Sequence, residues 1–208
     1  LSSGVAILFS SFISDYQGPL EQILMPILVV VFFTIGANVL NDYFDYDTDK
    51  INRPDRSIVK GDITREQALY LSLISFIIGI YFALRLSSDS QIISLGISLP
   101  LLFLYNAKIK NYPLIGNIIV SIIIGLSFIY AGVVFENIKP LIVPSLLAFG
   151  LTLIREVVKD IADFKGDEAI GARTLPIVFG KQKAIYFCTI LSILLSMAAF
   201  TLFLNGYY

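Results

Sequence analysis

Two clusters of aspartate residues carry the clearest chemical pattern in this sequence. Each cluster has the spacing i, i+3 and i+7, which brings three carboxylates to one face of an α-helix. The stretch NDYFDYDTD supplies Asp42, Asp45 and Asp49, and the stretch DIADFKGD supplies Asp160, Asp163 and Asp167. Asp47 belongs to the first stretch but points away from that face. Three like charges on one face repel unless a cation lies between them, so we predict that these six aspartates bind metal.

Both clusters follow apolar segments, at the predicted C-terminal ends of helices. The helix macrodipole disfavours negative charge there, and a cost that is accepted twice indicates function rather than a solvated helix end. Because the clusters contain only oxygen ligands, they suit Mg²⁺ or Mn²⁺, and Mg²⁺ is usually held by one or two carboxylates together with substrate phosphates.

Candidate ligands for an anionic substrate surround the aspartates. Arg binds phosphate bidentately and Lys as a point charge, although each base could instead set topology or pair with an aspartate. The predicted substrate-binding residues are Asn38, Asn41, Arg53, Arg56, Lys60, Tyr105, Lys108, Lys110, Arg155, Lys159 and Arg173.

The composition excludes several classes of protein. Hydrophobic residues make up 56% of the 208 residues, charged residues only 15%, and the formal net charge is -1. These values exclude an ordinary soluble domain, a disordered chain and a nucleic-acid binder that relies on net positive charge. The chain has no His and one Cys, Cys188, so His-based triads, His or Cys zinc sites and internal disulfides are excluded as well.

Seven apolar stretches predict an all-α fold. They are continuous rather than alternating, and most approach the roughly 20 residues that span a bilayer, which favours helices over strands. They are Leu1–Ser14, Gln22–Leu40, Ala68–Leu84, Ile92–Tyr105, Tyr112–Phe135, Ile138–Ile154 and Ala184–Leu204. We interpret the first as the remnant of a longer helix. The prediction is a polytopic membrane helix bundle with seven transmembrane helices, in a single domain over residues 1–208 that is truncated at both ends.

The basic residues predict the orientation of this bundle. Thirteen of the 15 lie in the connections after the second, fourth and sixth stretches, together with 12 of the 16 acidic residues. By the positive-inside rule, these connections face the cytoplasm. We therefore expect a multi-pass protein of the cell membrane with its active site on the cytoplasmic side.

The resemblance to a known family is carried by three stretches: GANVLNDYFDYDTDKINRPDRSIVKGDIT, YNAKIK and REVVKDIADFKGDEAIGARTLPIVFGK. From about Gly36 to Lys181, the chain resembles the UbiA superfamily of intramembrane prenyltransferases. The signatures of that superfamily are an NDxxDxxxD motif, here Asn41 to Asp49, and a second motif of DxxxD type, here Asp163 to Asp167. Within the superfamily, the chain is most similar to the archaeal branch that acts in ether-lipid synthesis.

The resemblance implies nine helices around a central cavity, of which this chain shows seven, with diphosphate and Mg²⁺ under a cytoplasmic cap. It implies Mg²⁺-dependent transfer of a geranylgeranyl group from geranylgeranyl diphosphate to geranylgeranylglyceryl phosphate, within the lipid bilayer. The implied catalytic residues are Asp45, Asp49, Asp163 and Asp167. The spacing of the YNAKIK loop leaves open whether Lys108 or Lys110 reaches phosphate, and either a carboxylate or the diphosphate takes the proton.

Two other functions fit part of this pattern. A prenyltransferase for an aromatic acceptor, such as 4-hydroxybenzoate or a quinone or haem precursor, would share both aspartate motifs but would not need to bind an acceptor phosphate. A divalent-cation transporter would also use acidic residues in a membrane protein, but it would be expected to carry them near the bilayer midplane.

Overall fold

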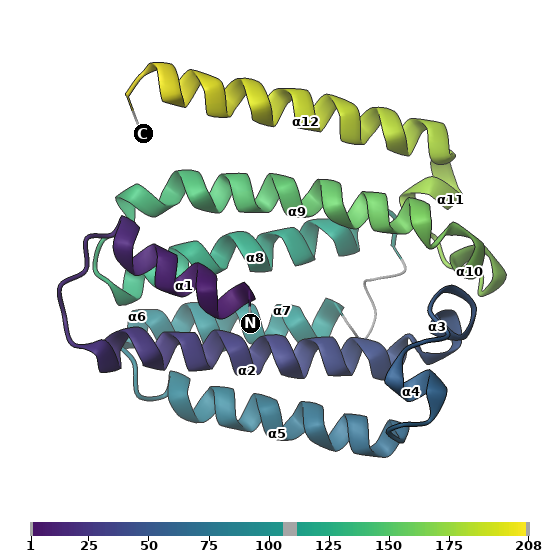
Figure 1. Cartoon of the computed structure of the whole chain (residues 1–208), viewed down its shortest axis with the longest axis horizontal. Helices are drawn as coiled ribbons and strands as arrows, with labels where there is room; N and C mark the ends of the chain where they lie inside the picture. The colour runs from purple at the N-terminus through teal and green to yellow at the C-terminus, as the bar shows by residue number, and fades with distance from the viewer. Residues whose placement is uncertain (1, 106–111, 207–208) are drawn as a thin grey trace.

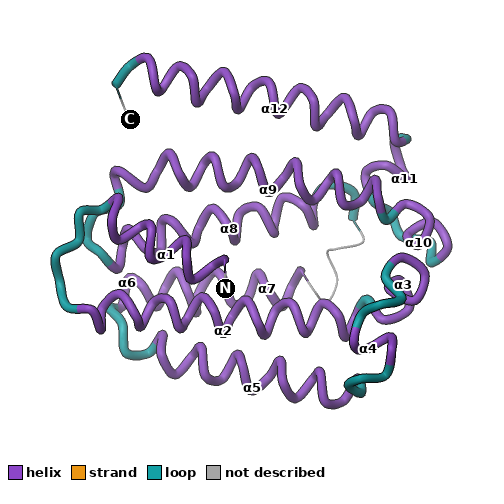
Figure 2. Tube along the Cα trace, in the orientation of Figure 1, coloured by secondary structure: helices purple, strands orange, loops and turns teal. Residues whose placement is uncertain are grey.

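The computed structural model describes residues 2–105 and 112–206, and over these residues the chain is helical with no strand (Figure 2). Long helices run side by side along the bundle (Figure 1). They are α2 (Leu20–Phe44), α5 (Arg65–Ala83), α8 (Ile115–Val134), α9 (Ile142–Ala162) and α12 (Lys181–Leu204). The shorter helix α1 (Ser2–Ile13) packs against α2 and α8. The short 3₁₀-helix η3 (Lys139–Leu141) leads into α9. The all-α prediction is confirmed.

The predicted helix at Ile92–Tyr105 consists of the π-helix η1 (Ile92–Ser98) and α7 (Leu99–Leu104), and α6 (Ser88–Gln91) precedes it directly. Pro100 stands at the start of α7. Because proline lacks an N–H and its ring clashes with the carbonyl of residue i-4, the wider π turns before it accommodate the ring without ending the helix.

The predicted number of spanning helices is not reproduced. Among the described residues, five helices are long and apolar enough to cross a membrane, and the helices at Ser3–Ile13 and Ser88–Leu104 are shorter. Large apolar side chains such as Ile190, Leu194 and Met197 are more than half exposed on α12, as expected for a surface in contact with lipid. The chain is therefore a multi-pass membrane protein, with five candidate spans among the described residues.

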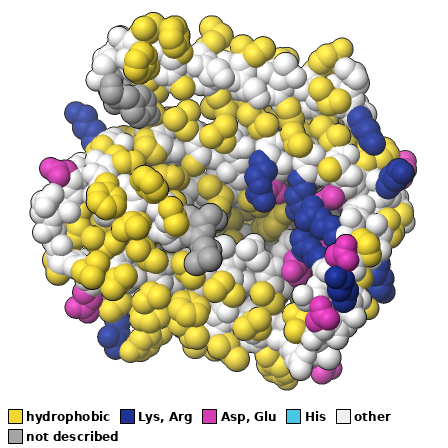
Figure 3. All heavy atoms as spheres, in the orientation of Figure 1, with side chains coloured by type: hydrophobic (Ala, Val, Ile, Leu, Met, Phe, Trp, Pro, Cys, Tyr) yellow, Lys and Arg dark blue, Asp and Glu magenta, His cyan; other side chains and the backbone are white. Residues whose placement is uncertain are grey.

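Four short helices lie together at one end of the bundle: α3 (Tyr46–Asn52), α4 (Ser57–Lys60), α10 (Phe164–Ala169) and α11 (Leu175–Phe179) (Figure 1). The acidic and basic side chains gather at this end, whereas the sides of the long helices are mostly apolar (Figure 3). The bundle thus separates a charged end from an apolar body.

Helix α9 continues past Ile154, the last residue of the sixth apolar stretch, to Ala162, so the second aspartate cluster begins at its C-terminal end, as predicted. Polar residues do not end this helix. Arg155, Glu156 and Lys159 all line a cavity rather than facing lipid, so the helical backbone continues past the last apolar residue.

Helices α2 and α5 pack closely through two reciprocal pairs of Phe and Gly. A Cβ on Gly79 would lie 2.4 Å from the ring of Phe33, and a Cβ on Gly36 would lie 3.1 Å from the ring of Phe76. The hydroxyl of Ser72 also donates to the carbonyl of Gly36 at 2.8 Å. Small residues let membrane helices approach in this way, so Gly36 and Gly79 allow the close packing of α2 on α5.

We predict that Gly79→Ala destabilises the bundle by about 1–3 kcal/mol, because the buried Phe33 ring must move to accept a new methyl group. Thermal unfolding in detergent measures the effect. Gly96→Ala is the matched control, since no atom lies within 4 Å of the Cβ that it would add. Equal melting temperatures for the two variants would contradict this account of the helix interface.

Candidate active site

The two aspartate clusters adopt the same backbone turn. Helix α2 gives way to α3 at Asp45, with φ -87° and ψ 5°, and α9 gives way to α10 at Asp163, with φ -82° and ψ 4°. The N–H of Asp45 donates to the carbonyl of Asn41 at 2.8 Å, and that of Asp163 donates to the carbonyl of Lys159 at 2.9 Å. We call these two turns the acidic corners. The sequence repeat is thus also a repeat in backbone structure.

The acidic corners face a pocket of about 180 Å³, here called the polar pocket. Its described lining has five acidic side chains and three basic ones: Asp45, Asp49, Asp160, Asp163, Asp167, Arg53, Arg56 and Lys159. With every group ionised, this lining is net negative. A polyanion would therefore be repelled from the polar pocket unless added cations reversed the sign of its charge.

A larger cavity of about 850 Å³ extends from the same end of the bundle into its apolar body. It shares four lining residues with the polar pocket: Arg53, Arg56, Tyr105 and Lys159. Farther from that end, it is lined by apolar side chains that include Val29, Phe33 and Phe128. Along α2 the lining extends from Val29 to Asp42, which is about 20 Å at the rise of an α-helix.

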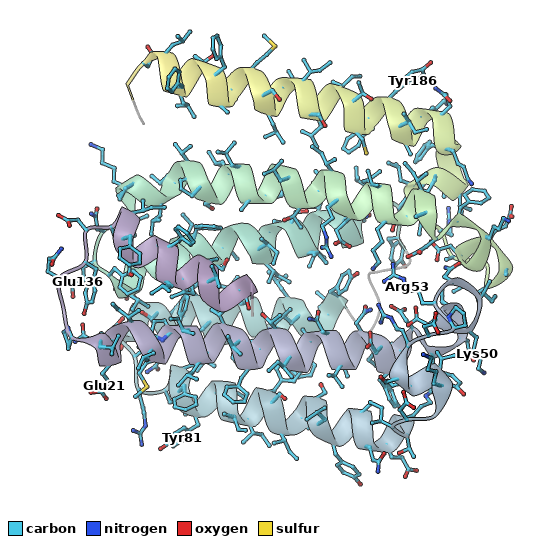
Figure 4. All side chains as sticks on the ribbon, in the orientation of Figure 1. Glu21, Lys50, Arg53, Tyr81, Glu136 and Tyr186 are labelled. Atoms are coloured by element: carbon cyan, nitrogen blue, oxygen red, sulfur yellow. The ribbon has the colours of Figure 1, made fainter. Side chains whose placement is uncertain are left out.

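Two arginines after the first cluster contact the carboxylates of both clusters. Arg56 forms ion pairs with Asp42 and with Asp49, the latter at 3.3 Å. Arg53 pairs with Asp163 of the other acidic corner at 2.9 Å. Figure 4 shows Arg53 directed inward, toward α9, and Lys50 on the outer side of α3. The arginines thus offset part of the carboxylate charge across the two halves of the site.

Amide side chains hold further carboxylates in place. Asn41 donates to Asp45 at 2.6 Å, and Asn117 of α8 donates to Asp160 at 2.9 Å. The side chain of Asp47 is 75% exposed and pairs with Lys50 at 3.2 Å, as its position off the helix face predicts. These contacts distinguish Asp45 and Asp160, which line the site, from Asp47, which faces solvent.

Burial raises the pKa of Asp49 and of Asp167, each to about 6. The next contribution is the charge of nearby carboxylates, which is that of Asp45 for Asp49 and that of Asp163 and Asp45 for Asp167. Burial also lowers the pKa of the Arg56 guanidinium. The site therefore holds two carboxylates whose ionised forms are disfavoured, and a cation bound beside them would relieve this cost.

Most of the predicted site residues line one of the two spaces, but not always together. Asp42 lines the larger cavity, whereas Asp45 and Asp49, at and after the first acidic corner, line the polar pocket. Arg56 pairs with both Asp42 and Asp49 and so connects the two spaces. Asn38, Asn41 and Arg155 also line the larger cavity.

Two predicted residues line neither space, and two more lie outside the described residues. Lys60 pairs with the exposed Asp55 at 3.1 Å, and neither it nor the exposed Arg173 is among the lining residues of the polar pocket or the larger cavity. Lys108 and Lys110 lie outside the described residues.

The sequence alone did not single out several residues that the fold brings to the site. Glu156 is 6% exposed, lines the larger cavity and accepts a hydrogen bond from Arg155 at 2.6 Å. Glu156 lies between Arg155 and Lys159 in the REVVKD stretch, and this position could have identified it as a site residue. Asn117 and Asn52 carried no such signal, since each acts on a cluster that is far away in the sequence.

Comparison with known proteins places these features in one family. The model of the UbiA prenyltransferase family matches residues 4–208, so the chain belongs to that family. It is 37% identical to the digeranylgeranylglyceryl phosphate synthase of Pyrococcus horikoshii over 200 residues, which are 95% of this chain and 72% of the relative. The synthase of Pyrococcus furiosus is 40% identical over 172 residues, which are 83% of this chain and 62% of that relative. The chain thus spans between three fifths and three quarters of these proteins.

Solved structures agree with this assignment. The structure of a digeranylgeranylglyceryl phosphate synthase is similar over 100% of this chain and 74% of that protein, with a TM-score of 0.77 and 31% identity. A UbiA homologue from Archaeoglobus fulgidus bound to GPP and Mg²⁺ matches 98% of this chain and 75% of that protein, with a TM-score of 0.72 and 16% identity. At that identity, the second likeness establishes the fold alone.

We predict that the metal-free protein becomes more stable as the pH falls through about 6. The folded-state pKa values of Asp49 and Asp167 lie above the ordinary value of 3.8, so the folded protein binds these protons more tightly than the unfolded chain. Their stabilising contribution is complete below 3.8 and is lost as the pH rises through about 6. Melting temperatures in chelator between about pH 7.5 and pH 5 measure it. The Asp49→Asn/Asp167→Asn variant should lose this component, whereas Asp47→Asn should keep it. An unchanged pH dependence in the double variant would contradict the assignment.

Proposed function

We propose that this chain transfers a geranylgeranyl group from geranylgeranyl diphosphate to geranylgeranylglyceryl phosphate, in the synthesis of archaeal ether lipids. The proposal treats residues 1–208 as one prenyltransferase domain. It is supported by family membership and by relatives, at 37% and 40% identity, that are named digeranylgeranylglyceryl phosphate synthase.

The observation that carries the proposal is the junction of a charged pocket with a long apolar cavity. A prenyl diphosphate has an anionic head and a hydrocarbon tail, and the two spaces match these parts in order. Arg53, Arg56, Tyr105 and Lys159 line both, so the bond between head and tail would lie beside them. The apolar lining excludes water, which would otherwise capture the allylic cation as an alcohol.

The residues of the polar pocket fit a divalent cation, as proposed from the sequence. One carboxylate oxygen of Asp49, Oδ2, is buried and accepts no hydrogen bond, and its contact in the described residues is the ion pair with Arg56 at 3.3 Å. Its hydrogen-bonding capacity is therefore unused, and a hard metal ion would use it. No group of three acidic side chains within the described residues is close enough to hold a metal by itself. The remaining ligands would be diphosphate oxygens and water, as is usual for Mg²⁺. Asp45, Asp49, Asp163 and Asp167 would hold Mg²⁺ or Mn²⁺, which stabilises the negative charge of the departing diphosphate.

The basic residues of the chain complete the reaction site. Arg53, Arg56 and Lys159 place positive charge where the diphosphate oxygens gain negative charge as the bond to the prenyl carbon breaks. The new bond joins that prenyl carbon to a hydroxyl oxygen of the acceptor. The hydroxyl proton passes to a carboxylate or to the departing diphosphate.

The charge along α9 favours an acceptor that carries its own phosphate. The Arg155 side chain is 73% exposed, lines the larger cavity and uses Nη1 to bind Glu156. Its guanidinium has further donors for a second phosphate, which would be repelled by the first without added positive charge. An aromatic acceptor would make no such demand. The acidic residues in the described lining of the larger cavity, Asp42 and Glu156, lie within two turns of helix ends, which gives no support to an ion path.

We further propose that the charged end of the bundle is a cytoplasmic cap over a central cavity, with seven helices in the membrane. The bias of basic residues toward the connections at this end supports that orientation. The short helices α1 and α6 to α7 would complete the set if the bilayer thins or the helices tilt around them.

We expect turnover with geranylgeranyl diphosphate and geranylgeranylglyceryl phosphate in the presence of Mg²⁺, and loss of turnover in excess EDTA. Labelled donor in detergent, followed by lipid extraction, measures the product. Arg155→Gln should raise the acceptor KM more than the donor KM, because the free donors of Arg155 are proposed to bind the acceptor phosphate. Arg173→Gln, at an exposed position outside both spaces, should change neither constant. Faster prenylation of 4-hydroxybenzoate, or equal use of the dephosphorylated glycerol ether, would move the assignment to an aromatic or uncharged acceptor.

The orientation can be tested by thiol labelling in a Cys188→Ser background. A cysteine at Asp55, whose side chain is 92% exposed at the charged end, should react with a membrane-impermeant reagent only in inverted vesicles. A cysteine at the exposed Asp89, at the opposite end, should react in intact cells instead. The reverse pattern would place the active site outside the cell.

A further inference from the structure

One neutral side chain joins the two acidic corners directly. Asn52 is the last residue of α3, and its Nδ2 donates to the carbonyl of Asp163 at 3.0 Å. Its Oδ1 accepts from the backbone N–H of Gly166 at 3.0 Å. The amide thus contacts the carbonyl at one end and the N–H at the other end of the same turn. That turn connects Asp163 to Asp167, so Asn52 contacts the backbone that orients both carboxylates.

The fit between Asn52 and this turn is close. A Cβ on Gly166 would lie 2.3 to 2.5 Å from three atoms of the Asn52 side chain, so a larger residue at 166 would displace the amide. Gly166 is therefore matched to Asn52. The next residue, Arg53, pairs with the Asp163 carboxylate at 2.9 Å, so neighbouring residues contact both the backbone and the side chain of that corner.

We propose that Asn52 is a positioning residue that sets the separation of the two acidic corners before metal or diphosphate binds. The five carboxylates around the polar pocket repel one another and would drive the corners apart. An amide opposes that separation without adding charge, because it supplies one donor and one acceptor. The role in metal and diphosphate binding rests on the proposed function, whereas the effect on the separation of the corners does not.

The first experiment measures geometry without turnover. Spin labels at Asp47 and Glu168, both exposed and one beside each corner, report their separation by pulsed EPR in a Cys188→Ser background. In chelator, we expect a narrow distribution of label–label distances when Asn52 is intact. In the Asn52→Ala variant, the mean distance should be longer and the distribution broader. Addition of Mg²⁺ with inorganic diphosphate should narrow the distribution again. Identical distributions with and without Asn52 in chelator would overturn the proposal, whatever reaction the protein catalyses.

A matched control exists at the opposite end of the bundle. Asn137 also joins two segments with its amide, donating to the carbonyl of Ser14 at 3.1 Å. Asn137→Ala should cost comparable stability without changing the label distances. If it broadened the distribution as much as Asn52→Ala, the effect would be general loosening of the fold, and the assignment would be overturned.

Should Asn52→Ala not fold, Asn52→Asp is the alternative variant. It keeps the size of the side chain, loses the donor to Asp163 and adds a charge beside the carboxylates, so it should also separate the corners. A wild-type distribution in Asn52→Asp would contradict the role of the donor.

The second experiment tests the contact itself through Gly166. Gly166→Ala should broaden the label distances in chelator, because its methyl group displaces the amide. In the Asn52→Ala/Gly166→Ala variant there is no amide to displace. The distribution of label distances in this double variant should therefore be no broader than in Asn52→Ala alone. Additive effects would show that Gly166 acts independently of Asn52 and would overturn the assignment.

A third measurement separates positioning from a purely structural role. The Mg²⁺ concentration for half-maximal turnover should rise roughly tenfold in Asn52→Ala, the scale expected for losing one or two neutral hydrogen bonds. Turnover at saturating Mg²⁺ should be nearly restored, since bound cations then hold the corners together. Asn137→Ala should leave the Mg²⁺ requirement unchanged. Activity in Asn52→Ala that is reduced equally at every Mg²⁺ concentration would contradict the positioning role.

Discussion

Two ionised carboxylates 4 Å apart repel by about 4 kcal/mol at an effective dielectric constant of 20. Five such groups line a pocket of about 180 Å³ at one end of this bundle, and their mutual repulsion is the constraint on which the arrangement there depends. Arg53 and Arg56 offset part of it through ion pairs that reach both acidic corners. Burial, followed by the charge of the neighbouring carboxylates, raises the pKa of Asp49 and of Asp167 to about 6. The pocket is thus prepared for cations that the chain itself does not supply.

The turns at Asp45 and Asp163 determine where these carboxylates point. A straight extension of α2 or α9 would carry each cluster along the helix axis and away from the other. Because both helices end at the cluster and restart at a new angle, the two short helices α3 and α10 pack against each other. The nearly equal dihedral angles at the two corners indicate one structural solution used twice. A pocket formed in this way takes its charged side chains from both halves of the chain.

The apolar body of the bundle holds a cavity that meets the charged pocket at one end. Close packing of α2 on α5 through Gly36 and Gly79 brings these helices together on one side, and the larger cavity lies on the other side of α2. Charge is concentrated where the two spaces meet and is sparse along the rest of the cavity wall. The proposed substrate, with an anionic head and a hydrocarbon tail, would place the bond between them at this boundary. The apolar part of the lining would then limit the access of water to that bond.

The amino-acid sequence by itself determined the helical membrane character of the chain, the two aspartate clusters and the outward position of Asp47. These features depend on composition and on the short-range period of a helix, which can be read locally. Only the tertiary structure showed that five of the helices among the described residues are long and apolar enough to span, and that Asp42 lines the larger cavity whereas Asp49 lines the polar pocket. It also decided the contact between Asn52 and Gly166, which are 114 residues apart in the chain. The physical reason is that a local period specifies which way a side chain points from its own helix. Which distant backbone group meets that side chain depends on how the helices pack.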